Sequence, residues 1–450
     1  MKKSGNFSVV GIIAEYNPFH NGHAYHIAKA KELSGAEACV VVMSGDFVQR
    51  GAPAVCDKYI RTAMALKSGA DLVLEMPVRF AASSAEDFAA CGVALLRHLE
   101  VVSHLCFGSE CGDIHLLSQV SDILAREPAV YTKALKDVLR QGLTFPEARE
   151  QAVMEYLRTS GNEAGSNEPL IESLRQVLGS PNNILGIEYC KALNRQNCDI
   201  TPLTIQRAGS GYHDTEMTDC FASATGIRKT LQEMQDGQSL QAFPSSQQTP
   251  PALPLRSPDC YQTLKNQVPE DVLTALTECR PLFAEDFSAL LNASLLNLVH
   301  SGARLSDYAD VSEELEARLR SMLLEFGSWE ERIQRLKTKQ YTYTRVSRAL
   351  LHLMLGIKKT DMEAGRALDY APYARVLGFK RDSTGLLTQI KARSDIPLIT
   401  KTADAENILT PAAYTMLQQD FHCSHLYDAV WNGRYQQPLP NEFSRQIVIL

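Results

Sequence analysis

The first part of the chain alternates short apolar runs with longer stretches in which apolar residues recur at helical spacing. The apolar runs lie at residues 9–14, 38–43, 72–76 and 101–107, and the helical patterns at residues 24–34, 57–69 and 85–99. Apolar runs without polar alternation are typical of strands buried on both faces of a parallel sheet. The alternation predicts an α/β fold over residues 7–125, with a parallel sheet covered by helices on both faces.

Beyond this region the pattern becomes mainly helical. Residues 126–178 are expected to be helical apart from a loop at 159–169, and a strand at 200–206 and a helix over 222–235 follow. The run at residues 242–258, rich in Pro, Ser and Gln, is the clearest linker of the chain. We therefore predict a first domain at residues 1–240, a linker at 241–259 and a mostly helical second domain at 260–450.

The composition excludes several classes of protein. At 450 residues, with 45% hydrophobic and 22% charged residues, it is that of a globular protein of more than one domain. A net charge of −7 argues against nucleic-acid binding by the whole surface, and no apolar stretch approaches the roughly 20 residues of a membrane span. The N-terminus lacks the apolar core and cleavage site of a signal peptide, so we expect a cytoplasmic protein.

The cysteines indicate neither disulfides nor a metal site. Eleven are scattered without a C-x-x-C pair, which predicts reduced thiols. Residues 421–425, with the sequence FHCSH, bring possible ligands together but have no partner cluster elsewhere in the sequence. We therefore expect no metal held by protein ligands alone.

Two histidines occupy the predicted turn between the first strand and the first helix, in the sequence NPFHNGH. The free N–H groups at a helix start attract anions, and His20 and His23 can donate hydrogen bonds to phosphate oxygens. When protonated, they would also stabilise the charge that develops as an α-phosphate is attacked. Either histidine alone is more simply a turn or core residue, whereas the pair at this position favours a phosphate site.

A second helix start, SATGIR at residues 223–228, places hydroxyl groups before an arginine one turn into the helix. This combination can hold β- and γ-phosphates, although an ordinary capped helix with a surface arginine explains it equally well. Two such helix starts in one α/β domain are what an enzyme needs to bind a triphosphate and cleave it between the α- and β-phosphates. The loops after the predicted strands would form the wall of the site.

These motifs resemble those of a known superfamily. His20-Asn21-Gly22-His23 matches the H-x-G-H element of the HIGH nucleotidylyltransferases and class I aminoacyl-tRNA synthetases, and residues 223–228 are similar to their second element, with Ala224 replacing a serine. Over nearly the whole chain the sequence is similar to the tRNA(Met) cytidine acetate ligases. That resemblance rests on the ordered motifs EYNPFHNGH, SGDFVQRG, GADLVLEMP, FGSE, SPNNILGIEY, ASATGIR and KTKQYTYTRVSRALLH.

The resemblance implies a nucleotidylyltransferase-like first domain that binds ATP, and a two-step ligase reaction. ATP and acetate would give acetyl-adenylate and pyrophosphate, and the acetyl group would pass to the exocyclic amine of the wobble cytidine of elongator tRNA(Met). Mg²⁺ is the expected companion of ATP. The second domain is expected to contribute to tRNA binding.

The resemblance also implies roles for individual residues, with His20 and His23 as the catalytic residues. The implied ATP-binding residues are Ile13, Ala14, Glu15, Tyr16, Asn17, Pro18, Phe19, His20, Asn21, Gly22, His23, Ala24, Tyr25, His26, Gly108, Asn182, Arg207 and Ala208, and the second helix start adds Ser223, Thr225 and Arg228. We prefer Asn182 to its neighbour Asn183. Asp46 stands where the family has Asn, and its carboxylate would either serve a magnesium ion or lie outside the site.

A basic and aromatic stretch lies in the predicted second domain, at residues 332–348, and contains no acidic residue. Basic side chains neutralise phosphates, and tyrosines stack on unpaired bases such as those of an anticodon loop. A solvated helix face with packed tyrosines is the alternative, but the acidic charge of the whole chain makes the stretch stand out and favours tRNA. The expected tRNA-binding residues are Lys337, Lys339, Tyr341, Arg345 and Arg348.

Two other functions fit part of the sequence. An adenylyltransferase acting on a small-molecule acceptor would use the same two phosphate motifs, but it would need neither the basic stretch nor a large second domain. A nucleotide- or tRNA-binding protein without catalysis would be expected to lack the motif histidines, and both are present. The sequence therefore favours the tRNA-directed ligase.

Overall fold

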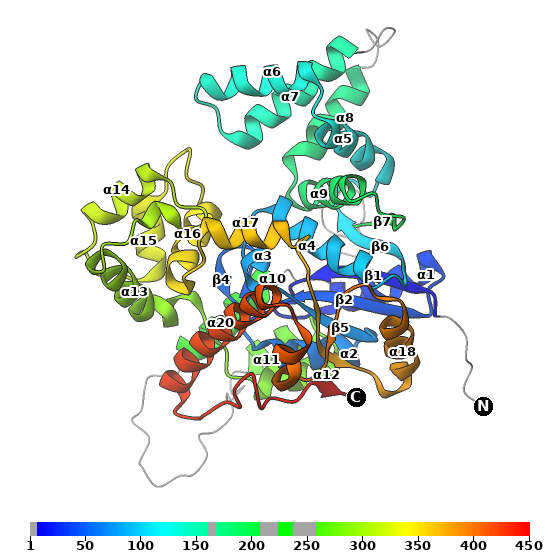
Figure 1. The fold of residues 1–450 in the computed structure, drawn as a ribbon, viewed down its shortest axis with the longest axis vertical. Coiled ribbons are helices and arrows are strands. Elements are labelled where there is room, and N and C mark those ends of the chain that lie inside the picture. The colour runs from blue at the N-terminus through cyan, green and yellow to red at the C-terminus, as the bar shows by residue number, and fades with distance from the viewer. Residues whose placement is uncertain (1–6, 161–167, 208–223, 237–257) are drawn as a thin grey trace.

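The computed structural model describes residues 7–160, 168–207, 224–236 and 258–450. A mostly parallel sheet lies at its centre, and helices surround the sheet (Figure 1). The strands of this sheet are β1 (Val9–Ala14), β2 (Ala38–Ser44), β5 (Leu72–Met76), β6 (Val102–Ser109), β7 (Thr201–Gln206), β8 (Ala374–Phe379), β9 (Leu398–Ile399) and β10 (Val448–Ile449). The predicted α/β fold and the mostly helical C-terminal part are confirmed.

The order of the strands indicates where a ligand should bind. It is β10-β8-β5-β2-β1-β6-β7, with β9 paired to β8. The strands β5, β2, β1, β6 and β7 are parallel neighbours, as in doubly wound sheets, whereas β8 runs antiparallel to β5. Ligands of such sheets bind outside the carboxyl ends of the strands where the order reverses, which here is between β1 and β6.

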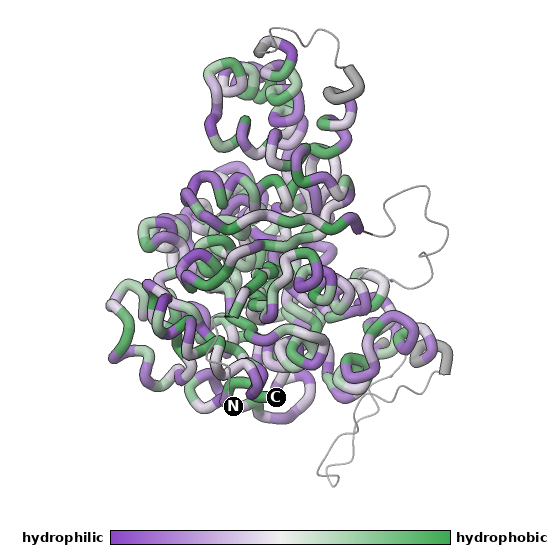
Figure 2. Tube along the Cα trace, turned by 90° about the vertical axis from the view of Figure 1, so that its right-hand side faces the viewer, coloured by the Kyte–Doolittle hydropathy of each residue, from purple (hydrophilic) through white to green (hydrophobic). Residues whose placement is uncertain are grey.

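The central strands are buried on both faces, which explains their continuous apolar sequences. In β1, Val9 and Ile13 belong to one core with α4 (Ala85–His98) and α9 (Pro181–Arg195), and Val10 and Ile12 to another with α1 (Asn21–Ser34) and α2 (Lys58–Lys67). Figure 2 shows hydrophobic strands running through the middle of the molecule, with polar residues on the outer helices.

Two sets of helices stand beside the sheet (Figure 1). The helical arm consists of α5 (Ile114–Arg126), α6 (Ala129–Arg140), α7 (Phe145–Ser160) and α8 (Glu168–Gly179), and it projects away from the sheet beyond α9. The helical group consists of α13 (Ser288–His300), α14 (Glu313–Ser321), α15 (Trp329–Leu336) and α16 (Tyr343–Leu355). The other helices are α3 (Val78–Ala81), α10 (Ala224–Asp236), α11 (Pro258–Lys265), α12 (Glu270–Glu278), α17 (Lys359–Ala367), α18 (Thr384–Arg393), α19 (Ala405–Ile408) and α20 (Pro411–Tyr435).

Some element boundaries differ from those expected. The stretch SGDFVQRG, expected as one of the loops after the predicted strands, belongs to a hairpin of β3 (Phe47–Val48) and β4 (Ala52–Pro53). The helix expected over residues 57–69 starts at Lys58, because the carboxylate of Asp57 caps it by accepting the N–H groups of Tyr59 and Ile60. Within the described residues, the cysteines are free thiols and no helix is long and apolar enough to cross a membrane.

The sheet takes strands from both sides of the predicted linker, because β8, β9 and β10 come from the part of the chain beyond residue 260. These strands could not be predicted from the sequence, since β9 and β10 are very short and Arg375 interrupts the apolar pattern of β8. The boundary at residues 241–259 falls largely outside the described residues and stays a prediction.

A buried cluster of charges joins β8 and the C-terminal tail to the rest of the sheet. Lys58 Nζ lies 2.8 Å from a carboxylate oxygen of Glu75, 3.2 Å from Glu442 and 3.6 Å from Asp46. Arg375 pairs with Glu75 at 2.6 Å and also with Glu442. Burial and Arg375 would lower the pKa of Lys58, but the three carboxylates outweigh them and hold that pKa above its ordinary value.

Replacing Lys58 with Met should lower the free energy of unfolding by about 3–5 kcal/mol, because buried carboxylates would lose a partner. The ion pair of Lys67 and Asp271 is the control, since those side chains are 43% and 60% exposed. Lys67→Met should change the free energy by less than about 1 kcal/mol. Urea unfolding followed by circular dichroism measures both variants, and equal losses would contradict a special role for the buried cluster.

Candidate functional site

A cavity of about 770 Å³ lies at the carboxyl ends of β1 and β6, where the strand order places a ligand site. Its wall takes residues from the loop after β1, the β3–β4 hairpin, β6, α9 and α10. The helical group completes the wall with Trp329, Glu330, Tyr343 and Ser347. Parts of the chain on both sides of the predicted linker therefore enclose one site.

The structure brings most of the predicted ATP-binding residues to this cavity. Those on its wall are Ile13, Ala14, Glu15, Tyr16, Asn17, His20, His23, His26, Gly108, Asn182, Arg207, Thr225 and Arg228. The predicted stretch also contains residues that do not line the cavity, and their role in ATP binding stays a prediction: Pro18, Phe19, Asn21, Gly22, Ala24 and Tyr25. Phe19, for example, packs in the core, and Tyr25 is 43% exposed. Ala208 and Ser223 lie outside the described residues.

His20 and His23 stack face to face, with ring centroids 3.7 Å apart. His23 Nδ1 accepts a hydrogen bond from the backbone N–H of His20 at 3.2 Å, which leaves the proton of the neutral His23 ring on Nε2. His20 Nδ1 and His26 Nε2 are buried and have no hydrogen-bond partner among the described residues. Buried polar atoms without partners are rare, and a ligand in the cavity would satisfy both.

The pKa values of the histidines in the free protein favour their neutral form. Burial, and to a lesser extent Arg207, lowers the pKa of both His20 and His26 to about 4. Burial and the neighbouring histidines also lower the pKa of His23. Each ring therefore presents one N–H donor at neutral pH, and a bound polyphosphate would raise these pKa values.

Asn17 and Arg228 fix the loop that carries the histidines. Asn17 Oδ1 accepts the N–H of Val55 at 2.9 Å, and the Asn17 carbonyl accepts a hydrogen bond from Arg228 Nη1 at 2.8 Å. Arg228 also donates to Thr225 Oγ1 at 2.9 Å. The two helix starts singled out in the sequence therefore meet at one cavity, where Arg228 both holds the loop and lines the wall.

Further along the wall, β6 and the start of α9 contribute Gly108 and Asn182. A Cβ atom at Gly108 would lie 3.2 Å from Arg207 Cγ, so the absence of a side chain at Gly108 leaves room for the Arg207 side chain to lie against β6. Asn182 donates to Glu110 Oε1 from its backbone N–H at 3.1 Å and from its side-chain amide at 2.6 Å. Asn182 lies on the cavity wall, whereas Asn183 does not and is 2% exposed.

Glu15 brings a carboxylate into a group of arginines. Its Oε1 accepts the backbone N–H of Gln49 at 2.7 Å. Burial raises the pKa of Glu15, and this hydrogen bond and the charges of Arg50, Arg228 and Arg61 oppose that rise. The cationic character of this end of the cavity suits a polyanionic ligand.

Gln49 and Arg50 lie on the wall, in a loop after a predicted strand that was expected to contribute to it. Gln49 and Arg50 belong to the motif SGDFVQRG. Trp329 and Glu330 also line the cavity but were not singled out in the sequence, and Tyr343 was noted only as part of the basic and aromatic stretch. No local pattern marks Trp329 and Glu330, because they reach the cavity only once the helical group packs on the hairpin.

The predicted tRNA-binding residues lie in the helical group and differ in accessibility. Lys337 and Lys339 are exposed in the connection between α15 and α16, and Arg345 is half-buried. Tyr341 is only 5% exposed, with the Arg345 guanidinium 4.9 Å from its ring centroid, so its ring cannot stack on a base as expected. Arg348 pairs with Asp310 at 2.9 Å. The two lysines are the members of the set that are open to a polyanion.

Asp46 belongs to the buried charge cluster around Lys58 and does not line the cavity. The sequence left two alternatives for Asp46, namely serving a magnesium ion or lying outside the site. The structure places it outside the site. Within the described residues, no group of three or more His, Cys, Asp or Glu side chains is arranged to hold a metal ion.

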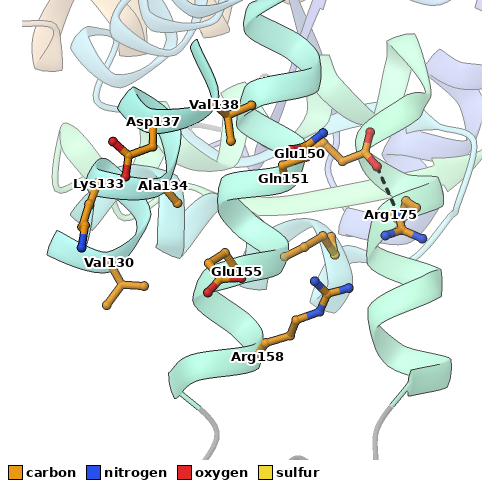
Figure 3. A pocket seen from close by; sticks show the side chains of 11 residues that line it. Val130, Lys133, Ala134, Asp137, Val138, Glu150, Gln151, Glu155, Arg158 and Arg175 are labelled. Carbon is orange, nitrogen blue, oxygen red and sulfur yellow. Dashed lines mark ion pairs between the residues drawn. The ribbon is translucent and has the colours of Figure 1, made fainter. Parts of the chain in front are cut away.

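A second hollow, of about 690 Å³, lies between the helices α6, α7 and α8 of the helical arm (Figure 3). Charged side chains of both signs line it, and Glu150 of α7 pairs with Arg175 of α8 at 3.3 Å. None of the predicted site residues lies there. The Glu150–Arg175 pair links the two helices of the arm.

Comparison with known proteins identifies the family. The model of the family described as HIGH Nucleotidyl Transferase matches residues 7–441. A tRNA(Met) cytidine acetate ligase of Acetivibrio thermocellus is 37% identical over 98% of this chain and 100% of its own. One of Clostridium kluyveri is 40% identical over 92% of this chain and 95% of its own.

Solved structures agree with this assignment. The crystal structure of Thermotoga maritima TmcAL bound with alpha-thio ATP is 29% identical, with a TM-score of 0.84 over 98% of this chain and 99% of that one. The apo form of that protein is 30% identical and has the same TM-score of 0.84. The resemblance inferred from the motifs is confirmed, and the chain belongs to the tRNA(Met) cytidine acetate ligase family of HIGH nucleotidyl transferases.

Proposed function

We propose that the protein is an ATP-dependent acetate ligase that forms acetyl-adenylate and transfers its acetyl group to the exocyclic amine of the wobble cytidine of elongator tRNA(Met). The names of the relatives and the ATP analogue bound to TmcAL support this proposal. The observation that carries it is the single cavity in which the stacked His20 and His23 meet Arg228 of the second helix start.

The first step activates acetate, because a carboxylate is a poor acyl donor until one oxygen becomes part of a good leaving group. An acetate oxygen attacks the α-phosphate of ATP, a new P–O bond forms, and the bond to the β-phosphate breaks to release pyrophosphate. Negative charge grows on the phosphate oxygens during this step. The N–H donors of His20 and His23 and the guanidinium of Arg228 stabilise that charge.

Mg²⁺ fits the site as a companion of the nucleotide. Magnesium is usually held by one or two carboxylates together with substrate phosphates, and the described residues contain no closed cluster of metal ligands. Glu15 would supply the protein carboxylate, since it lies on the wall beside the phosphate-binding loop. The ion would neutralise phosphate charge when bound.

The tRNA would lie across the helical group, where Lys337 and Lys339 are exposed and Tyr343 is 40% exposed. This arrangement supports the predicted contribution of the second domain to tRNA binding. A tRNA substrate and free thiols also support a cytoplasmic location.

The decisive test supplies ATP, Mg²⁺, labelled acetate and bulk tRNA, and counts label in the RNA. His23→Asn should lower acetate-dependent ATP–pyrophosphate exchange by roughly 10²–10³-fold, because a donor to the α-phosphate is lost. His115→Asn, at an exposed position outside the cavity, should leave exchange unchanged. ATP consumption with a small acceptor and no label in RNA would instead support the alternative adenylyltransferase.

The pH dependence tests the neutral histidines. Because the pKa of His20 is about 4 in the free protein, this group is already deprotonated above pH 5. The value of kcat/KM for ATP in the exchange reaction reports ionisations of the free enzyme and its substrate, so His20 should add no inflection between pH 6 and 8. Comparing wild type with His20→Asn isolates its contribution. A fall in kcat/KM with rising pH, centred near pH 6.5 and absent from the variant, would show instead that the active form of the free enzyme has His20 protonated.

The exposed lysines should contribute to tRNA affinity through charge. Lys337→Ala with Lys339→Ala should weaken binding and reduce the slope of log K against log salt by about one to two, because fewer counterions are released. Lys391→Ala with Arg393→Ala removes the same charge from exposed positions on α18, outside the cavity, and should have a smaller effect. Filter binding over a salt titration measures both, and matching slopes for the two double variants would exclude a specific basic contact.

A further inference from the structure

The two ends of the main cavity differ in charge. The end formed by the loop after β1 presents hydrogen-bond donors and cations, among them His20, Arg207 and Arg228. The end beside the helical group presents aromatic rings and the carboxylates of Glu330 and of Glu285, which lies just before α13. Carboxylates repel phosphates, so the second end suits an uncharged, planar group that carries N–H donors.

The Glu285 carboxylate caps the start of α15. Its Oε2 accepts the backbone N–H of Trp329 at 3.2 Å, and its Oε1 accepts that of Glu330 at 3.0 Å. The carboxylate thereby satisfies free N–H groups at the helix start. Glu330 is the carboxylate at this end that remains for a ligand.

The wall around Glu330 is fixed by a chain of hydrogen bonds. Trp329 Nε1 donates to Ser347 Oγ at 3.3 Å, and the Ser347 hydroxyl donates to the carbonyl of Gly51 at 2.8 Å. Gly51 has a φ of 79°, and a Cβ atom there would lie 2.3 Å from the backbone nitrogen of Arg348, so only glycine permits this approach. The α16 helix is therefore held against the hairpin that also carries Arg50.

Tyr343 lies one turn before Ser347 on α16, so both side chains are on the same face of the helix. Its hydroxyl donates to Glu330 Oε2 at 2.6 Å, and Gln334 Nε2 donates to Glu330 Oε1 at 2.7 Å. Burial and the hydrogen bond to Glu330 raise the pKa of Tyr343, so the phenol stays protonated. The ring is 40% exposed, which leaves surface for stacking.

We infer that Glu330 and Tyr343 form the subsite for the acceptor base, which rests on the proposed function. The Tyr343 ring stacks on the cytosine, and the Glu330 carboxylate accepts a hydrogen bond from its exocyclic amine. Uracil carries a carbonyl oxygen in the place of that amine, and two acceptors would then face each other. The same pair therefore selects cytosine over uracil.

Glu330 also has a part in the transfer step. The amine nitrogen attacks the acetyl carbonyl carbon of the adenylate, a C–N bond forms, and the C–O bond to the phosphate of AMP breaks. The nitrogen loses one proton, and Glu330 accepts it. AMP leaves with the electron pair of the broken bond, so the step balances without a further reactant. An aromatic amine is a weak nucleophile, which is why a nearby base matters.

An independent observation at the other end of the cavity indicates that the cavity as a whole takes a ligand. His20 Nδ1 is buried without a partner among the described residues, in a residue that is 7% exposed, and it lines the same cavity. A nucleotide bound there would place its reactive phosphate between the histidines and the helical group.

The test separates the two steps of the reaction. Glu330→Gln should keep acetate-dependent ATP–pyrophosphate exchange within about 2-fold of wild type, yet slow acetyl transfer to tRNA by about 100-fold or more, because the proton acceptor is lost. Glu313→Gln, on α14 with a side chain 84% exposed, is the charge-matched control and should leave both steps unchanged.

Tyr343 provides a second, independent variant. Tyr343→Ala should raise KM for tRNA on the order of 10-fold through the loss of stacking, while Tyr343→Phe, which keeps the ring, should change it little. Exchange activity in each variant also shows that the cavity is folded.

Three results would overturn the inference. Transfer by Glu330→Gln within about 3-fold of wild type would remove Glu330 from the acceptor site. A parallel loss of exchange and transfer would place Glu330 in the first step. Absence of acetate-dependent exchange in wild type would reject the proposed function and, with it, the acceptor subsite. The first two results differ from this one because they leave exchange by the wild type intact.

Discussion

The ammonium group of Lys58 is fully buried, and the arrangement of the chain depends on the carboxylates that neutralise its charge. A buried ammonium is tolerated only with carboxylate partners, and these come from β5, from the loop after β2 and from the C-terminal tail. Arg375 of β8 completes the cluster. The charges therefore tie the last part of the chain to the first, and the helical group that closes the cavity lies on the segment between them.

The cavity depends on this link between the two parts of the chain, because residues from both parts line it. The loop after β1 brings donors for a polyanion, and α15 and α16 bring the opposite wall with its carboxylates and rings. The β3–β4 hairpin connects the two walls through the bond from Ser347 to Gly51. Activation of acetate and delivery to an acceptor can thus take place in one cavity lined by both parts of the chain.

Structural features with local causes could be predicted from the sequence. Features that arise where distant segments pack together could not. A strand, a turn and a helix carry their own signals in the residues around His20, so the local structure of this loop could be predicted. The neutral state of that histidine could not, because burial and the charge of Arg207 from another strand produce it. Arg375 made β8 look unlike a buried strand, since its carboxylate partners are remote in sequence. Glu330 had no local signal, because its place in the cavity comes from helix packing.

The position of β8 in the sheet has a consequence for how the chain is made. β5 ends at Met76, but β8, its neighbour on the outer side, begins only at Ala374. During synthesis the apolar β5 is therefore an open edge strand, with unpaired backbone groups, until most of the chain has left the ribosome. The central sheet reaches its final form only when the nearly complete polypeptide is available, and for most of translation the growing chain depends on other means of keeping that edge from self-association.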